Sequence, residues 1–86
     1  MKKQQSILIT GCSTGIGLET ALYLQEKGFN VFASARTEHD VQKLYNRGLK
    51  AFYLDVTKPE TIQVTLKRVL EQTRGKLDCI FNNAGF

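Results

Sequence analysis

The sequence predicts an α/β fold in which four parallel strands alternate with three helices. Two observations support this class. Short apolar runs of strand length recur along the 86 residues, and a longer stretch with helical periodicity, closed by a glycine, follows each of the first three. Strands that alternate with helices pair in parallel through right-handed crossovers. The composition, 42% hydrophobic and 23% charged, is typical of a globular protein.

Each element follows from a local signal. The glycine-rich segment after the first apolar run leads into a helix that ends near residue 27, and Gly28, Gly48 and Gly75 close the three helices. The pattern is β-α-β-α-β-α-β, a partial Rossmann-like parallel sheet, and residues 1–86 are expected to be the N-terminal, incomplete part of one such domain. The predicted strands are residues 6–10, 30–35, 50–54 and 77–81, and the two later helices are residues 38–47 and 58–74.

Some details of capping and packing are also predicted. Thr57 and Glu60 have the spacing of a capping box at the start of the third helix, where Pro59 is tolerated. Cys79 is expected in the core, within the last strand. In the first helix, residues at helical spacing form one face that packs closely on the sheet: Gly17, Thr20, Ala21, Leu24 and Gly28.

Charge and composition argue against several functional classes. The net charge is +4, but the basic residues are dispersed, which favours a solvated surface over a nucleic-acid-binding face. The apolar runs are too short for a signal peptide or a membrane span, so a cytoplasmic protein is expected. Cys12 and Cys79 lie far apart and His39 lies in a polar stretch, so neither a disulfide framework nor a metal site is indicated.

The most informative segment is TGCSTGIG, residues 10–17, which joins the first strand to the first helix. Backbone amides and the helix dipole can hold a pyrophosphate at such a junction. Gly11 permits the tight turn, Gly15 lets the backbone approach the phosphates, and Gly17 lets the helix pack against the strand. On its own, a glycine-rich turn is equally typical of an ordinary strand-to-helix connection.

Neighbouring residues complete the predicted phosphate site. Ser13 and Thr14 add hydroxyl donors, and Ile16 belongs to the helix start that faces the phosphates. The segment is not a Walker loop, because no Gly-Lys-Ser/Thr follows it. A helix N-terminus can lower the pKa of a thiol, which makes an oxidation-prone Cys12 one alternative. We interpret Cys12 instead as a small filler beneath the phosphates.

The spacing G-x-x-x-G-x-G resembles the TGxxxGxG signature of the short-chain dehydrogenase/reductase family, and two later segments match at corresponding places. In isolation both would be ordinary turn residues. The resemblance implies that Asp55 and Val56, after the third strand, contact the adenine ring. Residues 82–85 reproduce the NNAG motif of the family. This motif places Asn83 beside the cofactor, where it braces the sheet, and its last two residues, Ala84 and Gly85, belong to the same predicted site.

The end of the second strand selects between the two nicotinamide dinucleotides. Dinucleotide folds that prefer NAD place an acid there to bind the ribose 2′-hydroxyl, whereas this segment is Ser34-Ala35-Arg36. Arg36 can form a charge-assisted contact with a 2′-phosphate, and the alternative is a solvated arginine. Because the absence of an acid is independent support, the predicted cofactor is NADP(H).

No residue of the chain is assigned a catalytic role. The resemblance implies that a Ser, an Asn and a Tyr-x-x-x-Lys pair carry out the proton chemistry, all beyond residue 86. Tyr23 and Lys27 have the Tyr-x-x-x-Lys spacing, but Tyr23 lies roughly 9 Å further along the first helix than Gly17, away from the phosphates. We therefore interpret them as a packing tyrosine and a solvated lysine.

Together these features predict the N-terminal cofactor-binding portion of an NADP(H)-dependent short-chain oxidoreductase that acts on alcohol or carbonyl substrates by hydride transfer. The 86-residue chain alone is expected to be inactive. The alternative is a truncated, catalytically inactive nucleotide-binding module, and a small basic nucleic-acid binder is a weaker third interpretation. Substrate, reaction direction and oligomeric state are not predicted.

Overall fold

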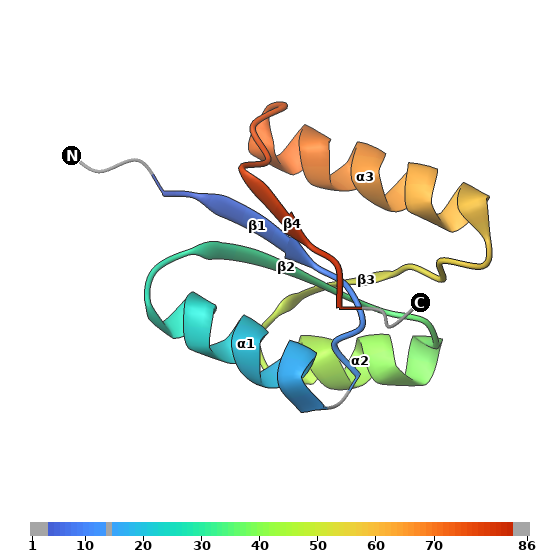
Figure 1. Ribbon diagram of the computed structural model, residues 1–86, viewed down its shortest axis with the longest axis horizontal. Helices are drawn as coiled ribbons and strands as arrows, with labels where there is room; N and C mark the ends of the chain where they lie inside the picture. The colour runs from blue at the N-terminus through green and yellow to red at the C-terminus, as the bar shows by residue number, and fades with distance from the viewer. Residues whose placement is uncertain (1–3, 14, 84–86) are drawn as a thin grey trace.

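Four parallel strands form one sheet in the spatial order β3-β2-β1-β4, and three helices cover it (Figure 1). These elements belong to a computed structural model that describes residues 4–13 and 15–83. The predicted α/β class and the alternation of elements are confirmed. The strands are β1 (Ser6–Ile9), β2 (Asn30–Ala35), β3 (Lys50–Tyr53) and β4 (Cys79–Phe81), and the helices are α1 (Gly15–Glu26), α2 (Glu38–Asn46) and α3 (Pro59–Thr73).

β1 lies inside the sheet because it pairs with β2 on one side and with β4 on the other. Leu8 is in register with Phe32 of β2 and Ile80 of β4, and Phe32 pairs in turn with Lys50 of β3. All three pairings are parallel, so the carboxyl ends of the strands meet at one edge of the sheet. Doubly wound α/β folds bind their ligands at this edge.

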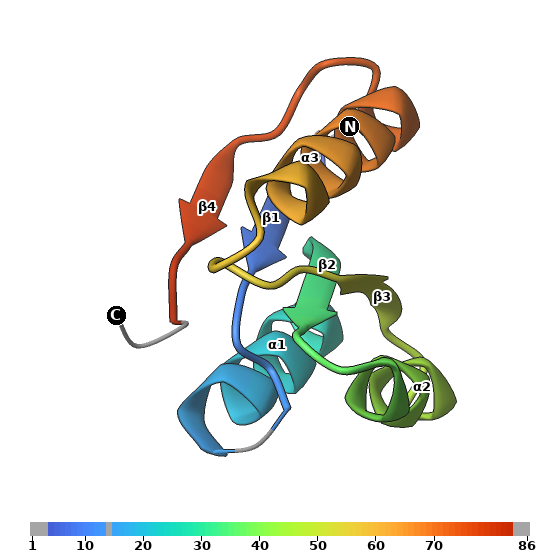
Figure 2. The same cartoon turned by 90° about the vertical axis from the view of Figure 1, so that its right-hand side faces the viewer.

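The helices cover both faces of the sheet, with α1 and α2 on one face and α3 on the other (Figure 2). Successive strand side chains point to opposite faces. Ile7 and Ile9 therefore pack in the cluster under α1 and α2, whereas Leu8 packs with Val69 of α3. Fully burying one such side chain stabilises the fold by about 1.5–3 kcal/mol, so both layers contribute to stability.

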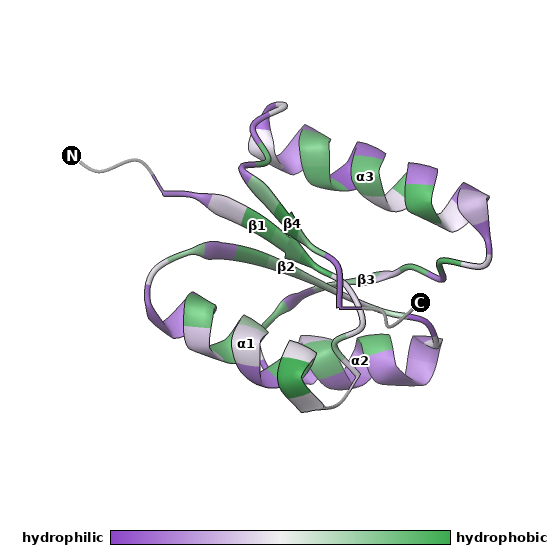
Figure 3. Ribbon diagram, in the orientation of Figure 1, coloured by the Kyte–Doolittle hydropathy of each residue, from purple (hydrophilic) through white to green (hydrophobic). Residues whose placement is uncertain are grey.

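The hydropathy of the chain follows these layers: the strands are mainly hydrophobic, and the helices alternate between hydrophobic and hydrophilic residues (Figure 3). In α1, Gly17 and Ala21 are buried as predicted. Gly28 is exposed, so the prediction that it belongs to the packed face is wrong. It lies beyond the end of α1 with φ of 98°, and it serves there as the left-handed residue that ends the helix.

β4 is the strand that departs most from prediction. All three of its residues are exposed, so the prediction that Cys79 is a core residue is wrong. Within the described residues β4 pairs only with β1, and an edge strand has a neighbour on one side alone. Just before β4, Asp78 bonds twice to Ser6, donating its N–H to the carbonyl at 3.0 Å and accepting the Ser6 N–H on Oδ2 at 2.8 Å.

The start of α3 also differs from prediction. The N-cap residue is Lys58, which forms no side-chain capping bond, so the prediction of a capping box formed by Thr57 and Glu60 is wrong. Thr57 directs its hydroxyl to Asp55 Oδ1 at 2.7 Å instead. The helix still begins at Pro59, whose ring suits the first turn.

Candidate functional site

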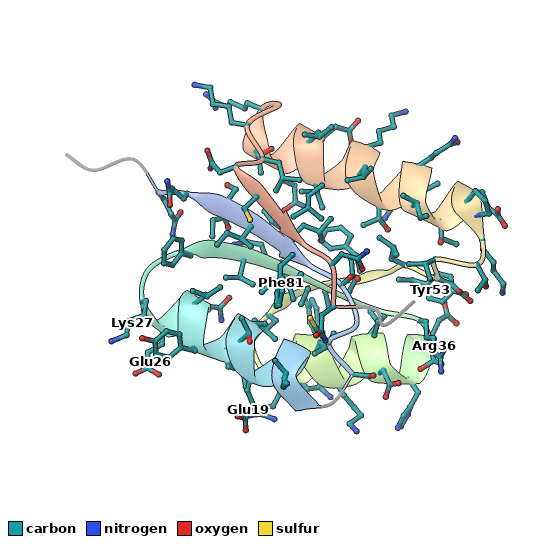
Figure 4. The ribbon with its side chains drawn as sticks, in the orientation of Figure 1. Glu19, Glu26, Lys27, Arg36, Tyr53 and Phe81 are labelled. Carbon is teal, nitrogen blue, oxygen red and sulfur yellow. The ribbon has the colours of Figure 1, made fainter. Side chains whose placement is uncertain are left out.

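The predicted site residues lie around the carboxyl-terminal edge of the sheet. Arg36 follows β2, Asp55 comes two residues after β3, and Asn83 comes two residues after β4, while the glycine-rich turn follows β1. Figure 4 shows Arg36 near Tyr53, the last residue of β3, at one end of the molecule. Parallel pairing thus brings segments that are distant in sequence to a common edge.

The backbone of the turn after β1 depends on glycine at two points. Gly11 and Gly15 have φ of 68° and 67°, in the left-handed region where other residues are strained. The Cys12 N–H donates to the Ser34 carbonyl at 2.8 Å and ties the turn to β2. Thr14 lies outside the described residues. The turn has the shape that the sequence predicts, and its contact with a phosphate stays a prediction.

Hydrogen bonds around Thr10 lock the turn to the segment after β4. The Thr10 hydroxyl accepts the Asn83 N–H at 3.0 Å and donates to Asn82 Oδ1 at 3.0 Å. The Asn83 side-chain amide donates to the Gly11 carbonyl at 3.1 Å. Asn83 therefore braces the ends of two neighbouring strands. Ala84 and Gly85, which complete the predicted motif, lie outside the described residues.

Gly17 is a point of very close approach. A Cβ at this position would lie 2.5 Å from Asn83 Nδ2 and 2.6 Å from the Gly11 carbonyl oxygen. The sequence predicts glycine here for packing between helix and strand. The structure gives a more specific reason, because the first turn of α1 lies directly against the Asn83 side chain and the backbone of the turn.

Cys12 fills space beneath the turn. The residue is 0% exposed, and its Sγ donates to the Ile9 carbonyl at 3.2 Å. Burial raises the pKa of the Cys12 thiol from 9.0 to about 11, although the backbone hydrogen bond with Ser34 acts in the opposite direction. A raised pKa disfavours the reactive thiolate. The burial of Cys12 and its raised pKa contradict the alternative of an activated thiol, and its place beneath the phosphates stays a prediction.

Asp55 is held by the turn that follows β3. Its Oδ1 accepts the Thr57 hydroxyl at 2.7 Å and the Thr57 N–H at 3.0 Å, and its own N–H donates to Thr61 Oγ1 at 2.9 Å. The side-chain bond from Thr57 and then its backbone bond lower the pKa of the Asp55 carboxyl, with added help from the charges of Lys58 and Arg36. Asp55 is thus an ionised acceptor at neutral pH.

Arg36 presents an exposed guanidinium beside this acceptor. Within the described part of the chain its side chain has no hydrogen-bond partner, yet its charge contributes to the lowered pKa of Asp55. Five N–H donors of a guanidinium are therefore open to an incoming ligand. A guanidinium is planar and always charged, and its paired N–H donors match the geometry of a phosphate group.

The other predicted residues lie in less distinctive places. Ile16 is 73% exposed, while Ser13 and Val56 are half-buried. Tyr23 is 58% exposed, so the prediction of a packing tyrosine is wrong, and the Lys27 Nζ lies 5.4 Å from the centre of its ring. Tyr23 lies in the last turn of α1 and Lys27 directly follows the helix, so neither residue joins the site.

Two threonines that the sequence did not assign to the site, Thr10 and Thr57, prove central to its hydrogen bonding. Thr10 directly precedes the glycine-rich turn, and Thr57 comes two residues after Asp55. A threonine so close to a turn or a carboxylate is a usable signal, because its hydroxyl can bond to local backbone and side-chain groups. Its actual partners are set by the fold.

A cavity of about 440 Å³ adjoins the glycine-rich turn on its α2 side. It is bordered by residues of the turn and of two helices, and Arg36, Asp55 and Asn83 do not line it. No cluster of three metal-ligating side chains occurs in residues 4–13 and 15–83. Nor does any helix within these ranges have the length and apolar character to cross a membrane. The cavity lining is Ser13, Gly15, Leu18, Lys43, Leu44, Asn46 and Arg47.

The chain is similar to proteins of known family. The family model for short chain dehydrogenases matches residues 5–86. An uncharacterized oxidoreductase of Escherichia coli K12, YbbO, is 45% identical over 83 residues, which cover 96% of this chain and 31% of that protein. An NADPH-dependent 1-acyldihydroxyacetone phosphate reductase of Schizosaccharomyces pombe is 38% identical over 86 residues, covering 99% of this chain and 29% of the relative.

A solved structure has the same fold. The F189W variant of actinorhodin polyketide ketoreductase, crystallised with NADPH, superposes with a TM-score of 0.80 at 34% sequence identity. The match covers 96% of this chain and 34% of the ketoreductase. The chain therefore spans about a third of the length of the relatives it matches.

Proposed function

Because the chain belongs to the short-chain dehydrogenase family, whose members are oxidoreductases, we propose that it is the NADP(H)-binding portion of a reductase or dehydrogenase for alcohol and carbonyl substrates. The observation that carries the choice of cofactor is Arg36. Its guanidinium is exposed and free of hydrogen bonds to the described residues, at the strand end where an NAD-binding site needs an acid.

The phosphate end of the dinucleotide fits the turn after β1. Gly11 and Gly15 have positive φ angles, which shape the turn so that its backbone can approach a phosphate closely. The first amides of α1, from Gly15 to Gly17, supply hydrogen-bond donors at the positive end of the helix dipole. Ser13 adds a hydroxyl, as does Thr14 outside the described residues. The pyrophosphate binds here, and Arg36 contacts the 2′-phosphate from the end of β2.

The adenine and nicotinamide ends fit the other two strand ends. Asp55 offers an ionised acceptor to the adenine amino group, beside Val56. Asn83, with Ala84 and Gly85, borders the nicotinamide side. Two similar proteins support this choice of cofactor, since one is named as NADPH-dependent and the other was crystallised with NADPH.

The bound dinucleotide supplies or accepts the hydride, and the chain positions it. Residues 1–86 include no group to which we assign the transfer of the alcohol proton. Tyr23 and Lys27 do not serve, because they lie at the C-terminal end of α1, opposite the helix start that adjoins the glycine-rich turn. We therefore propose that this chain alone binds cofactor without turning over substrate, as an inactive nucleotide-binding module would. Carbonyl-dependent oxidation of NADPH by the isolated chain would contradict this assignment.

Calorimetric titration of the chain with NADPH and NADH tests the cofactor. We expect tighter binding of NADPH, and the Arg36→Ala variant to lose about 10- to 100-fold in NADPH affinity with little change for NADH, because one charge-assisted hydrogen bond contributes about 1.5–3 kcal/mol. Arg68→Ala is the matched control, since Arg68 is an exposed arginine of α3. Equal affinity for both dinucleotides, or equal losses in the two variants, would refute the role of Arg36.

A further inference from the structure

The turn between β3 and α3 holds one carboxylate from two directions. Thr57 donates both its hydroxyl and its N–H to Asp55 Oδ1, at 2.7 Å and 3.0 Å. Thr61 accepts the Asp55 N–H at 2.9 Å and donates its hydroxyl toward the Asp55 and Lys58 carbonyls, at 2.9 Å and 2.7 Å. Backbone and side chain of Asp55 are thus restrained separately, the first by Thr61 and the second by Thr57.

The two carboxylate oxygens of Asp55 are consequently not equivalent. Oδ1 is occupied by two donors from Thr57. Oδ2 has no hydrogen-bond partner within residues 4–13 and 15–83. An ionised carboxylate accepts hydrogen bonds and donates none. A carboxylate that rotates freely presents either oxygen in many directions, whereas this one presents a single acceptor in a fixed direction.

We propose that Thr57 is a positioning residue that fixes the Asp55 carboxylate, so that Oδ2 accepts a hydrogen bond from the exocyclic amino group of the cofactor's adenine base. The proposal rests on the proposed function, which places the adenine beside Asp55. Thr57 acts through Asp55 and does not touch the base. Its effect is selectivity: a fixed, ionised acceptor attracts the amino group of adenine and repels the carbonyl oxygen of hypoxanthine.

Local stability of the turn is the competing role for Thr57. Its N–H bond to Asp55 closes a common type of side-chain turn, and such a turn stabilises the backbone with any base bound or with none. The two roles differ in what the loss of the hydroxyl changes. Loss of a purely structural bond weakens the binding of all dinucleotides alike. Loss of the positioning bond weakens discrimination between bases.

The experiment compares NADPH with nicotinamide hypoxanthine dinucleotide phosphate, in its reduced form, by calorimetric titration of wild type, Thr57→Val and Thr57→Ser. Valine keeps the shape and the N–H of Thr57 but removes the hydroxyl donor, and serine restores it. Thr73→Val is the matched control, because among the described residues the Thr73 hydroxyl bonds to the Leu70 carbonyl alone, near the end of α3. Thr57 is exposed, so these substitutions leave no cavity in the core.

Wild type is expected to bind NADPH at least about 10-fold more tightly than the hypoxanthine analogue, as expected for one hydrogen bond to a charged group. In Thr57→Val this ratio falls about 5-fold, mainly through weaker NADPH binding, while Thr57→Ser and Thr73→Val keep it. A nuclear magnetic resonance titration of the free protein gives a second readout. The pKa of the Asp55 carboxyl rises in Thr57→Val and stays low in Thr57→Ser.

Two outcomes overturn the positioning role while leaving the proposed function intact. One is an unchanged adenine-to-hypoxanthine ratio in Thr57→Val with tight NADPH binding. The other is an equal loss of affinity for both dinucleotides. Absence of NADPH binding by wild type is a different result, and it refutes the proposed function together with everything that depends on it.

Discussion

β4 pairs with β1, the strand that leads into the glycine-rich turn, yet this turn and β4 differ sharply in burial. Cys12 in the turn is 0% exposed and its thiol pKa is raised to about 11, whereas Cys79 in β4 is exposed. β1 has a strand on each side and a helix layer on each face, whereas β4 has a strand on one side only among residues 4–13 and 15–83. Neighbouring segments of one sheet therefore differ in environment because of their position in the strand order.

Thiol labelling of the folded protein measures this difference most directly. We expect Cys79 to react rapidly with a disulfide reagent and Cys12 to react at least about 100-fold more slowly, because Cys12 becomes accessible only when the structure opens. The Cys79→Ala variant isolates the slow thiol, and Cys12→Ala isolates the fast one. Similar rates for the two thiols would show that the turn opens freely.

The raised pKa of Cys12 also predicts how stability changes with pH. In the unfolded chain the thiol ionises near its ordinary pKa of 9.0, and in the folded protein near 11, so between these values the unfolded state binds fewer protons. Stability therefore falls as the pH rises through this window. Urea unfolding at pH 8, 9, 10 and 11 measures the slope, and Cys12→Ala should reduce it. An identical slope in both proteins would contradict the assignment.

A substitution at Gly17 tests whether the turn and the segment after β4 form one packed unit. Alanine usually stabilises a helix interior relative to glycine by about 0.5–1 kcal/mol. Here its Cβ would lie 2.5 Å from Asn83 Nδ2 and 2.6 Å from the Gly11 carbonyl, so we expect Gly17→Ala to destabilise the fold by about 1–3 kcal/mol.

The measurement is the free energy of unfolding in urea. Glu19→Ala is the control, because Glu19 is an exposed residue of the same helix and should change stability by less than about 0.5 kcal/mol. Asn83→Ala removes one of the two close contacts, so combining it with Gly17→Ala should recover part of the loss. A more stable Gly17→Ala variant would mean that the close approach does not exist in solution.

The smallest expected effect concerns Ser34 of β2, whose hydroxyl is buried without a hydrogen-bond partner among the described residues. A buried hydroxyl that forms no bond is unfavourable, so Ser34→Ala should raise stability by about 0.5–1 kcal/mol. The Cys12 bond to the Ser34 carbonyl is a backbone contact and remains. Ser34→Val is the comparison, since its added volume should cost stability in this packed strand. A destabilised Ser34→Ala variant would indicate a partner for the hydroxyl.

Most of the strands and helices were predictable because their signals are local. Apolar runs, glycine C-caps and the turn at residues 10–17 all act over a few neighbouring residues, so the order of elements and the shape of the glycine-rich turn follow from the sequence. The location of the candidate site at one edge of the sheet was also predictable from the sequence. The segments containing Arg36, Asp55 and Asn83 each follow a strand, and parallel strands carry such segments to one edge.

The errors concern features that depend on what lies nearby in three dimensions. Cys79 is a small apolar residue of a predicted strand, but it is exposed, because β4 has a neighbouring strand on one side only within the described residues. Thr57 has capping-box spacing, but Asp55 Oδ1 lies 2.7 Å from its hydroxyl and accepts it. Cys79 could be buried or exposed, and Thr57 could cap the helix or bond to Asp55. In each case the neighbouring residues in the folded structure decided the outcome.

From sequence, this protein has a parallel α/β sheet, a glycine-rich turn made for close backbone approach, and no acid at the end of its second strand. Short-range chain preferences and hydrophobic periodicity are sufficient for these features. The hydrogen bonds of Asn83 to the turn, the burial of Cys12 and the two unequal oxygens of Asp55 come from the tertiary structure. These features depend on contacts between residues that are distant in sequence. Atomic positions must be right to within a few tenths of an ångström for such contacts, and only the folded packing of the chain determines them.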